Sequence, residues 1–200
     1  MLKIEYPNSA CALKYETIFQ LLVATVLSAQ CTDERVNMVT PILFSKYPTP
    51  KALNNASLAE IEKIIRSTGF YKNKALSLIS ISKTLVEDHA SSVPKDLDEL
   101  VRLRGVGRKT ANVVLGVGYG IASGIVVDTH VKRISNRIGL TSNSDPVKIE
   151  ADLVTLVQKK DWVIFSQLMI DHGRAICSAR RAPSCDQCVI NTYCQKNGVR

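Results

Sequence analysis

Apolar residues recur at helical spacing along almost the whole chain. They are dense over Tyr15 to Gln30, which predicts a buried helix, and the polar stretch that follows ends this helix. A second helix is predicted to begin at Asp33, as its N-cap, and to reach about Tyr47, with Pro41 as a kink or boundary. No pair of segments shows the alternation of paired strands. The pattern therefore predicts an all-α fold.

Start and stop signals place further helices. Ser57 and Glu60 have the spacing of a capping box, in which each side chain bonds the other's backbone amide. Gly69 to Tyr71 interrupts the pattern before a long helix. Asp145-Pro146 is a strong start signal. The predicted ranges are 74–88, 97–103, a helix from 108, 129–138, 146–159 and 162–177.

The stretch Leu103 to Asp128 carries the most unusual pattern. Gly105-Val106-Gly107 predicts a tight turn in which both glycines can adopt positive φ, and it leads into a helix whose free amides form an anion site. Arg108 and Lys109 occupy the first turn, where the helix dipole disfavours cations, so a phosphate is expected there. Taken alone, Lys109 is more typical of a solvated surface. A second glycine-rich stretch, 116–124, leads to Asp128, which is placed to cap the next helix.

The C-terminal tail has four cysteines and no long apolar run. Cys177, Cys185, Cys188 and Cys194 are spaced C-x7-C-x2-C-x5-C, and a metal centre would supply the stability that a core does not. Zinc and a [4Fe-4S] cluster both accept four thiolates. Zinc sites usually pair two short C-x2-4-C segments, and only one such segment is present, which favours an iron–sulfur cluster over zinc. The alternative is a set of unrelated free thiols, as we expect for Cys11 and Cys31 elsewhere in the chain.

Composition narrows the class of protein. The 200 residues include 26 Lys and Arg against 18 Asp and Glu, a formal charge of +8, which favours a polyanionic partner. No apolar run approaches the ~20 residues of a membrane span, so no membrane partner is expected. No signal peptide is apparent, so a cytoplasmic location is expected. Clustered cysteines in a reducing compartment indicate a metal site rather than disulfides.

Several motifs together carry a family resemblance. They are L-x-G-V-G-R-K-T-A from Leu103, V-D-T-H-V around Asp128, L-S-A-Q-C-T-D from Leu27, G-F-Y-K-N-K-A from Gly69 and the cysteine tail. These motifs span nearly the whole chain, which resembles the endonuclease III family of helix-hairpin-helix DNA glycosylases. The resemblance implies two helical domains flanking a DNA-binding groove. A six-helix, barrel-like domain would take residues 11–121, and 122–200 with 1–10 would hold a [4Fe-4S] cluster on the four cysteines.

The resemblance also implies an activity. The chain would be a bifunctional glycosylase and abasic-site lyase, acting as a monomer on oxidised pyrimidines in double-stranded DNA, with Lys109 as nucleophile and Asp128 as catalytic carboxylate. Attack by lysine requires the neutral amine, which Arg108 and the positive helix end both favour. Two alternatives remain. One is an adenine-mispair glycosylase of the same superfamily, and the other is a non-catalytic helix-hairpin-helix protein that binds DNA structure.

The remaining DNA contacts are implied by position. Gln30 matches the residue that fills the space left by a flipped base, and Phe70 matches the apolar wedge. The backbone of Gly105, Val106 and Gly107, together with Arg108, would hold one phosphate, and Arg180 and Arg181 would contact others. The sequence departs from the family pattern in having Arg104 in place of proline and one extra residue between the first two cysteines. The extra residue lies in the loop that carries Arg180 and Arg181, so it affects the path of that loop.

Overall fold

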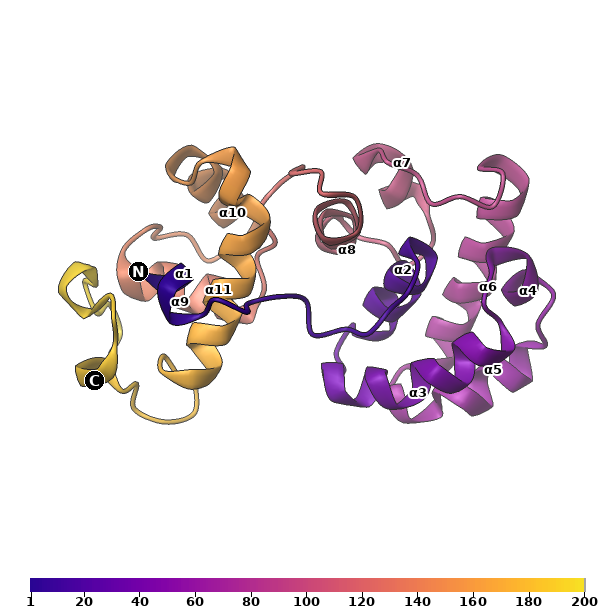
Figure 1. The fold of residues 1–200 in the computed structure, drawn as a ribbon, viewed down its shortest axis with the longest axis horizontal. Helices are drawn as coiled ribbons and strands as arrows, with labels where there is room; N and C mark the ends of the chain where they lie inside the picture. The colour runs from indigo at the N-terminus through magenta and orange to yellow at the C-terminus, as the bar shows by residue number, and fades with distance from the viewer. Residues whose placement is uncertain (200) are drawn as a thin grey trace. The chain divides into compact units, whose positions relative to one another are not determined.

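The computed structural model describes residues 1–199, and over that range every regular element is a helix, as predicted. None of these helices is both long enough and apolar enough to cross a membrane. The chain divides into two compact units (Figure 1). The central unit is Ala12–Ile121, and the terminal unit joins Met1–Cys11 to the chain from Ala122 onward.

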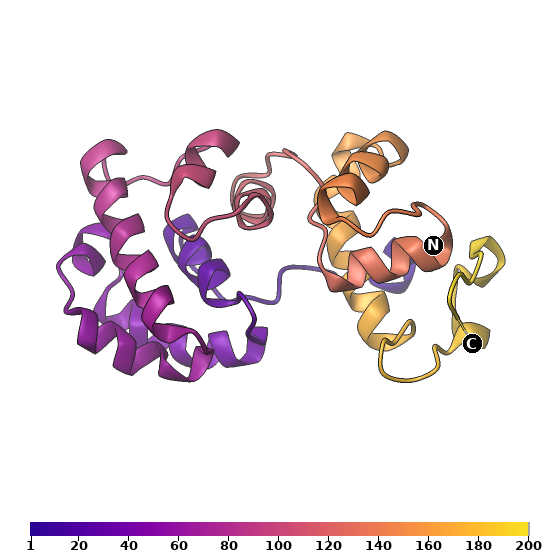
Figure 2. The ribbon, with the colours of Figure 1, turned by 180° about the vertical axis from the view of Figure 1, so that it is seen from behind.

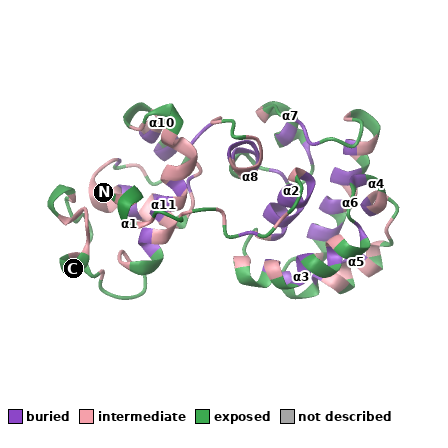
Figure 3. Cartoon of the chain, viewed as in Figure 1, coloured by how far each residue is buried: buried purple, intermediate pink, exposed green. Residues whose placement is uncertain are grey.

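The central unit is built around α2 (Ile18–Leu27). Nine of its ten residues are buried, so this helix is covered on all sides and not along one stripe (Figure 3). It begins later than the predicted Tyr15, because the Thr17 side chain accepts a hydrogen bond from the Gln20 amide and caps it there. The helix packs against α3, α6 and α8.

The other helices of the central unit enclose α2. The longest, α6, packs against α4 and α5, as both ribbon views show (Figures 1 and 2). The short helix α4 was not predicted. The elements are α3 (Asp33–Lys46), α4 (Pro50–Asn54), α5 (Leu58–Ile65), a 3-10 turn η1 (Arg66–Thr68), α6 (Tyr71–Asp88), α7 (Leu97–Arg102), α8 (Arg108–Val113) and its π-helical continuation η2 (Val114–Gly118).

The start and course of α3 differ from the prediction. The cap is Thr32, whose hydroxyl accepts from the Arg35 amide at 3.3 Å, and Asp33 is the first helical residue. An acidic side chain in the first turn is still stabilised by the positive end of the helix dipole. Pro41 does not end the helix, which continues to Lys46 because Leu43 beyond the proline is fully buried.

The predicted capping box of α5 does not form. Ser57 occupies the N-cap position, but its side chain makes no cap hydrogen bond. The Glu60 carboxylate instead binds Lys46 and accepts a hydrogen bond from the Tyr47 hydroxyl, which ties α5 to the end of α3. Glu60 therefore pairs with residues distant in the sequence and not with the backbone at the start of its own helix.

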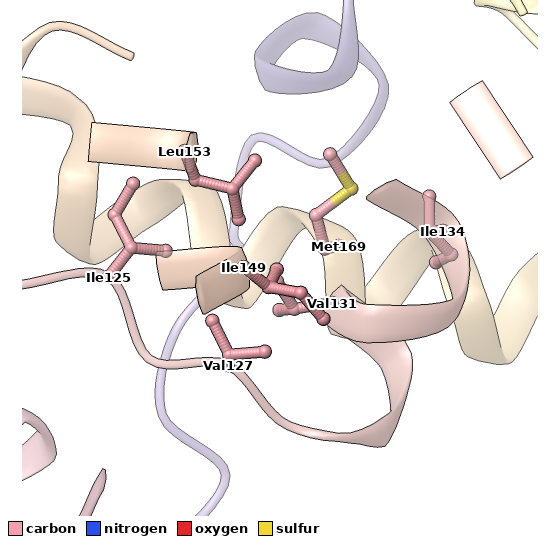
Figure 4. Close-up of a cluster of buried hydrophobic side chains, with 7 residues drawn as sticks. All are labelled: Ile125, Val127, Val131, Ile134, Ile149, Leu153 and Met169. Carbon is pink, nitrogen blue, oxygen red and sulfur yellow. The ribbon is translucent and has the colours of Figure 1, made fainter. Parts of the chain in front are cut away.

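The terminal unit combines both ends of the chain around one core. Its elements are α1 (Leu2–Glu5), α9 (Thr129–Ile138), α10 (Pro146–Leu156), the 3-10 turns η3 (Lys159–Asp161), η4 (Cys185–Gln187) and η5 (Asn191–Tyr193), and α11 (Trp162–Ala175). Figure 4 shows the buried cluster that holds them together: Ile125, Val127, Val131, Ile134, Ile149, Leu153 and Met169.

The first eleven residues are fastened to η3 and α11. The Lys3 ammonium lies 2.6 Å from Asp161, and the Ser9 hydroxyl donates to Asp171 at 2.6 Å. The Tyr6 hydroxyl lies 3.1 Å from Nδ1 of His172, which is 1% exposed. These contacts place the N-terminal segment in the same unit as the cysteine tail.

Candidate functional site

The turn between α7 and α8 is fixed by burial at its tip. Leu103 and Val106 are both buried, and the Val106 amide donates to the Leu103 carbonyl at 3.0 Å. Gly105 has φ 78°, and a Cβ there would lie 2.7 Å from Oγ of Ser77 on α6. Only glycine adopts this positive φ readily and also leaves room for the Ser77 side chain. The hairpin is therefore seated tightly on α6.

Gly107 does not use the positive φ that glycine allows. Its φ is −90°, an extended value open to any residue, and a Cβ would meet nothing within 4 Å. Of the two turn glycines, only Gly105 uses positive φ. Gly107 is the N-cap of α8, and no side-chain cap hydrogen bond forms there.

Lys109 projects from the exposed start of a well-anchored helix. Arg108 and Lys109 are exposed, whereas Ala111 and Asn112 in the next turn are buried. Within residues 1–199 the Lys109 ammonium has no hydrogen-bond or ion-pair partner. A free amine is thus carried on a rigid support.

The glycine-rich stretch after α8 is partly helical. The π-helical continuation η2 includes Gly116 and Gly118, and a Cβ at Gly118 would lie 3.2 Å from Leu21 on α2. Gly120 follows the end of this helix, and its φ of 68° lets its amide and that of Ile121 bond back to helix carbonyls. These glycines permit close packing and a helix end, so only the segment beyond Gly120 is the expected loop.

Asp128 is the N-cap of α9, as predicted. Its Oδ1 accepts hydrogen bonds from the amides of His130 and Val131, both at 2.8 Å. No hydrogen bond reaches Oδ2 within the described range, and the side chain is half-buried. Val127 beside it belongs to the buried cluster of Figure 4. One oxygen therefore fixes the carboxylate while the other is left for chemistry. Lys109 and Asp128 belong to different units.

Gln30 and Phe70 share an unusual backbone conformation. Both lie in the central unit with left-handed backbone, at φ 53° and φ 48° respectively, which is uncommon for residues with a side chain. Both are exposed, and Phe70 is the N-cap of α6 with 64% of its surface accessible. An exposed aromatic residue held in a strained conformation is typical of a functional position.

The four tail cysteines line one pocket. Cys177, Cys185, Cys188 and Cys194 face it together with apolar side chains, among them Ile134 of α9. All are free thiols. Within the described chain, no three His, Cys, Asp or Glu side chains converge closely enough to bind a single metal ion.

Two residues at this pocket were missed from the sequence. Nε2 of buried His172 lies 3.5 Å from Sγ of Cys188, and burial lowers the pKa of this histidine. The Arg137 guanidinium donates to Sγ of Cys177 at 3.2 Å and to the Ser178 carbonyl at 2.8 Å. The only available signal was that His172 precedes Cys177 by little more than one helical turn.

Arg180 and Arg181 lie exposed in the loop between the first two cysteines. The Ser178 hydroxyl accepts from both of their amides, at 3.2 and 3.3 Å, and so gives the loop a local turn. Both arginines are therefore exposed on a loop with a defined local turn.

Comparison with known proteins places this architecture in a family. Residues 23–159 match the model of the HhH-GPD superfamily of base excision DNA repair proteins. The chain is 52% identical over 194 residues to endonuclease III of Synechocystis sp., covering 97% of this chain and 88% of the relative. It is 43% identical to endonuclease III of Bacillus subtilis, covering 98% and 89%.

A solved structure agrees with these relatives. The structure of a trapped endonuclease III–DNA covalent intermediate matches with a TM-score of 0.91 and 41% identity, covering 98% of this chain and 91% of that one. The chain therefore belongs to the endonuclease III family of the HhH-GPD superfamily, the DNA glycosylases and abasic-site lyases that remove oxidised pyrimidines in base excision repair.

Proposed function

We propose that Lys109 is the nucleophile of this glycosylase and lyase. Its neutral amine attacks C1′ of a flipped nucleotide, and the base departs with the electrons of the glycosidic bond. The sugar ring then opens as its C1′–O4′ bond breaks and O4′ takes up a proton, which leaves a Schiff base between Lys109 and C1′ and makes the C2′ proton acidic. Loss of that proton expels the 3′ phosphate and cuts the strand, and water then releases Lys109. The observation that carries this proposal is the exposed, unpartnered amine at the anchored start of α8.

Asp128 is the carboxylate of the same reaction. Its Oδ2 makes no hydrogen bond in the described structure, so it is free to stabilise positive charge on the sugar or to accept a proton from the attacking amine. The two amides bound to Oδ1 prevent the side chain from rotating away. A negative group beside the positive end of α9 is also favoured electrostatically.

The DNA partner is a duplex that contains a damaged base or an abasic site. The backbone of Gly105 to Gly107 and the Arg108 side chain bind one backbone phosphate, and the exposed Arg180 and Arg181 bind others. The solved covalent and non-covalent DNA complexes of endonuclease III support this partner. A single copy carries both Lys109 and Asp128, so we propose that the protein acts as a monomer.

Gln30 and Phe70 enter the duplex when the nucleotide leaves it. Gln30 fills the vacated space and contacts the orphaned base, while Phe70 wedges between base pairs. Their exposure supports this role, because an accessible aromatic side chain gains most by stacking on bases.

The four cysteines are the ligands of a [4Fe-4S] cluster. The donor set fits, because four free thiols face one mostly apolar pocket in a tail whose own turns are short. A cluster bound there supplies a cross-link of thiolate–iron bonds to the tail. Arg137 and His172 approach two of the sulfurs and would orient them.

Reductive trapping tests the proposal. Borohydride added during turnover should produce a covalent protein–DNA adduct, and peptide mapping should place it at Lys109. Lys109→Gln should lose trapping and strand cleavage while binding abasic DNA within about threefold of wild type, because the hairpin amides remain. The matched control is Lys148→Gln, which removes an exposed lysine from the first turn of α10 and should trap normally. An adduct that persists in Lys109→Gln would place the nucleophile elsewhere.

A further inference from the structure

Lys74 is a buried cation outside the residues assigned above. It lies on α6 and is 6% exposed, although lysine is seldom fully buried. Its ammonium donates to the carbonyls of Leu27 and Thr68, both at 2.8 Å. Burial lowers the pKa of Lys74, and the nearby Cys31 acts in the opposite direction. Burying an ammonium is costly, and an apolar residue would fill the same space more cheaply.

The two carbonyls lie at the bases of two separate loops. Leu27 is the last residue of α2, three positions before Gln30, and Thr68 ends η1, two positions before Phe70. A lysine amine at the carboxyl end of a helix satisfies a carbonyl that has no intrahelical partner and complements the helix dipole. One ammonium thus joins the roots of both loops.

The backbone of Lys74 adds a third tie. Its amide donates to the Phe70 carbonyl at 3.1 Å and so closes the first turn of α6. Gln30 and Phe70 both have left-handed backbone, a conformation that persists only where the surroundings enforce it. In each loop, a carbonyl held by Lys74 lies within three residues of the strained position.

We infer that Lys74 is a positioning residue that couples the loops carrying Gln30 and Phe70, so that both side chains enter a damaged duplex together. The inference rests on the proposed roles of those two side chains. Lys74 itself does not touch DNA. Its removal should leave phosphate binding intact and weaken only the discrimination between damaged and undamaged duplex.

The test compares Lys74→Met with Lys83→Met. Methionine keeps the length of the side chain and removes its charge and donors, and Lys83 is an exposed lysine on the same helix, 3.9 Å from Glu87. The probes are a duplex with a tetrahydrofuran abasic site opposite 2-aminopurine and its undamaged counterpart. Wild type should change the 2-aminopurine fluorescence on binding, and Lys83→Met should match it.

Lys74→Met should bind the undamaged duplex within about twofold of wild type but lose roughly tenfold of its preference for the abasic duplex, together with most of the fluorescence change. Lys74→Gln, which can still donate to one carbonyl, should fall between the two and serves if the methionine variant does not fold. A folded variant with wild-type preference and fluorescence overturns the inference alone. A wild-type protein that gives no fluorescence change overturns the inserting roles of Gln30 and Phe70, and the inference with them.

Discussion

Asp128 has a structural role and a proposed chemical role, and two substitutions separate them. In Asp128→Asn the amide oxygen can still accept from His130 and Val131, because asparagine caps helices about as well as aspartate. Only the charge at the helix end is lost, which costs about 0.3–1 kcal/mol of unfolding free energy. Asp128→Ala also loses both cap hydrogen bonds, at a cost of about 0.5–2 kcal/mol.

Turnover should respond differently from stability. If the carboxylate stabilises charge or moves a proton, both substitutions should slow single-turnover base excision by ~10²–10⁴-fold, a rise of about 3–5 kcal/mol in activation free energy. Asp128→Asn should therefore combine almost normal stability with severely reduced chemistry. Denaturant unfolding and single-turnover excision measure the two quantities on the same preparations.

Asp145 supplies the matched control. It caps α10 in the same way, with Oδ1 accepting from the amides of Val147 and Lys148 at 3.0 Å each. Asp145→Asn and Asp145→Ala should change stability by amounts similar to those at Asp128 and leave excision within about twofold of wild type. The reasoning fails if Asp128→Asn excises within threefold of wild type, or if the Asp145 variants lose excision equally.

Three further predictions concern the hairpin, the surface network and the tail. Gly105→Ala should cost about 1–3 kcal/mol of stability and weaken duplex binding. Gly107→Ala, with extended backbone and open space, should change stability and binding little. Equal losses in the two variants would contradict the packing of the turn. The hydrogen bond to Glu60 raises the pKa of Tyr47 from 10.0 to about 12. The contribution of this hydrogen bond to folding stability is therefore complete below pH 10 and is lost as the pH rises to 12. Tyr47→Phe should abolish that alkaline loss of stability, and an unchanged pH profile of unfolding would refute the prediction. Purified without oxygen, the protein should contain iron and absorb at ~400 nm, and Cys188→Ser should lose both the iron and the absorbance. Zinc in place of iron would contradict the iron–sulfur cluster.

The sequence predicted most helices because their signals are local. Buried α2 and the caps at Asp128 and Asp145 follow from apolar spacing and from aspartates placed before helices. The errors arose where a distant partner decided the outcome. Glu60 has the capping-box spacing from Ser57, yet it bonds Tyr47 at the end of α3, and no local pattern contains that contact.

The candidate site divides along the same line. Spacing identified the four cysteines, and the pocket that they share is a tertiary fact that spacing cannot supply. The spacing shows that Gly105 and Gly107 can both adopt positive φ, but it does not show that only Gly105 does so, at close range to Ser77. Lys74 gave no signal at all, since a lysine at that position of a helix is ordinary until its burial is known.

The terminal unit draws on both ends of the chain, and this sets the order in which the protein matures on the ribosome. Residues 12–121 emerge as one continuous stretch and can fold while synthesis continues. Tyr6 must wait for His172, 166 residues later. A nascent or prematurely ended chain therefore displays the hairpin and Lys109 before it has an Asp128 held by a completed core. The terminal unit can complete its core and its contacts with the N-terminal segment only after the last part of the chain has been made.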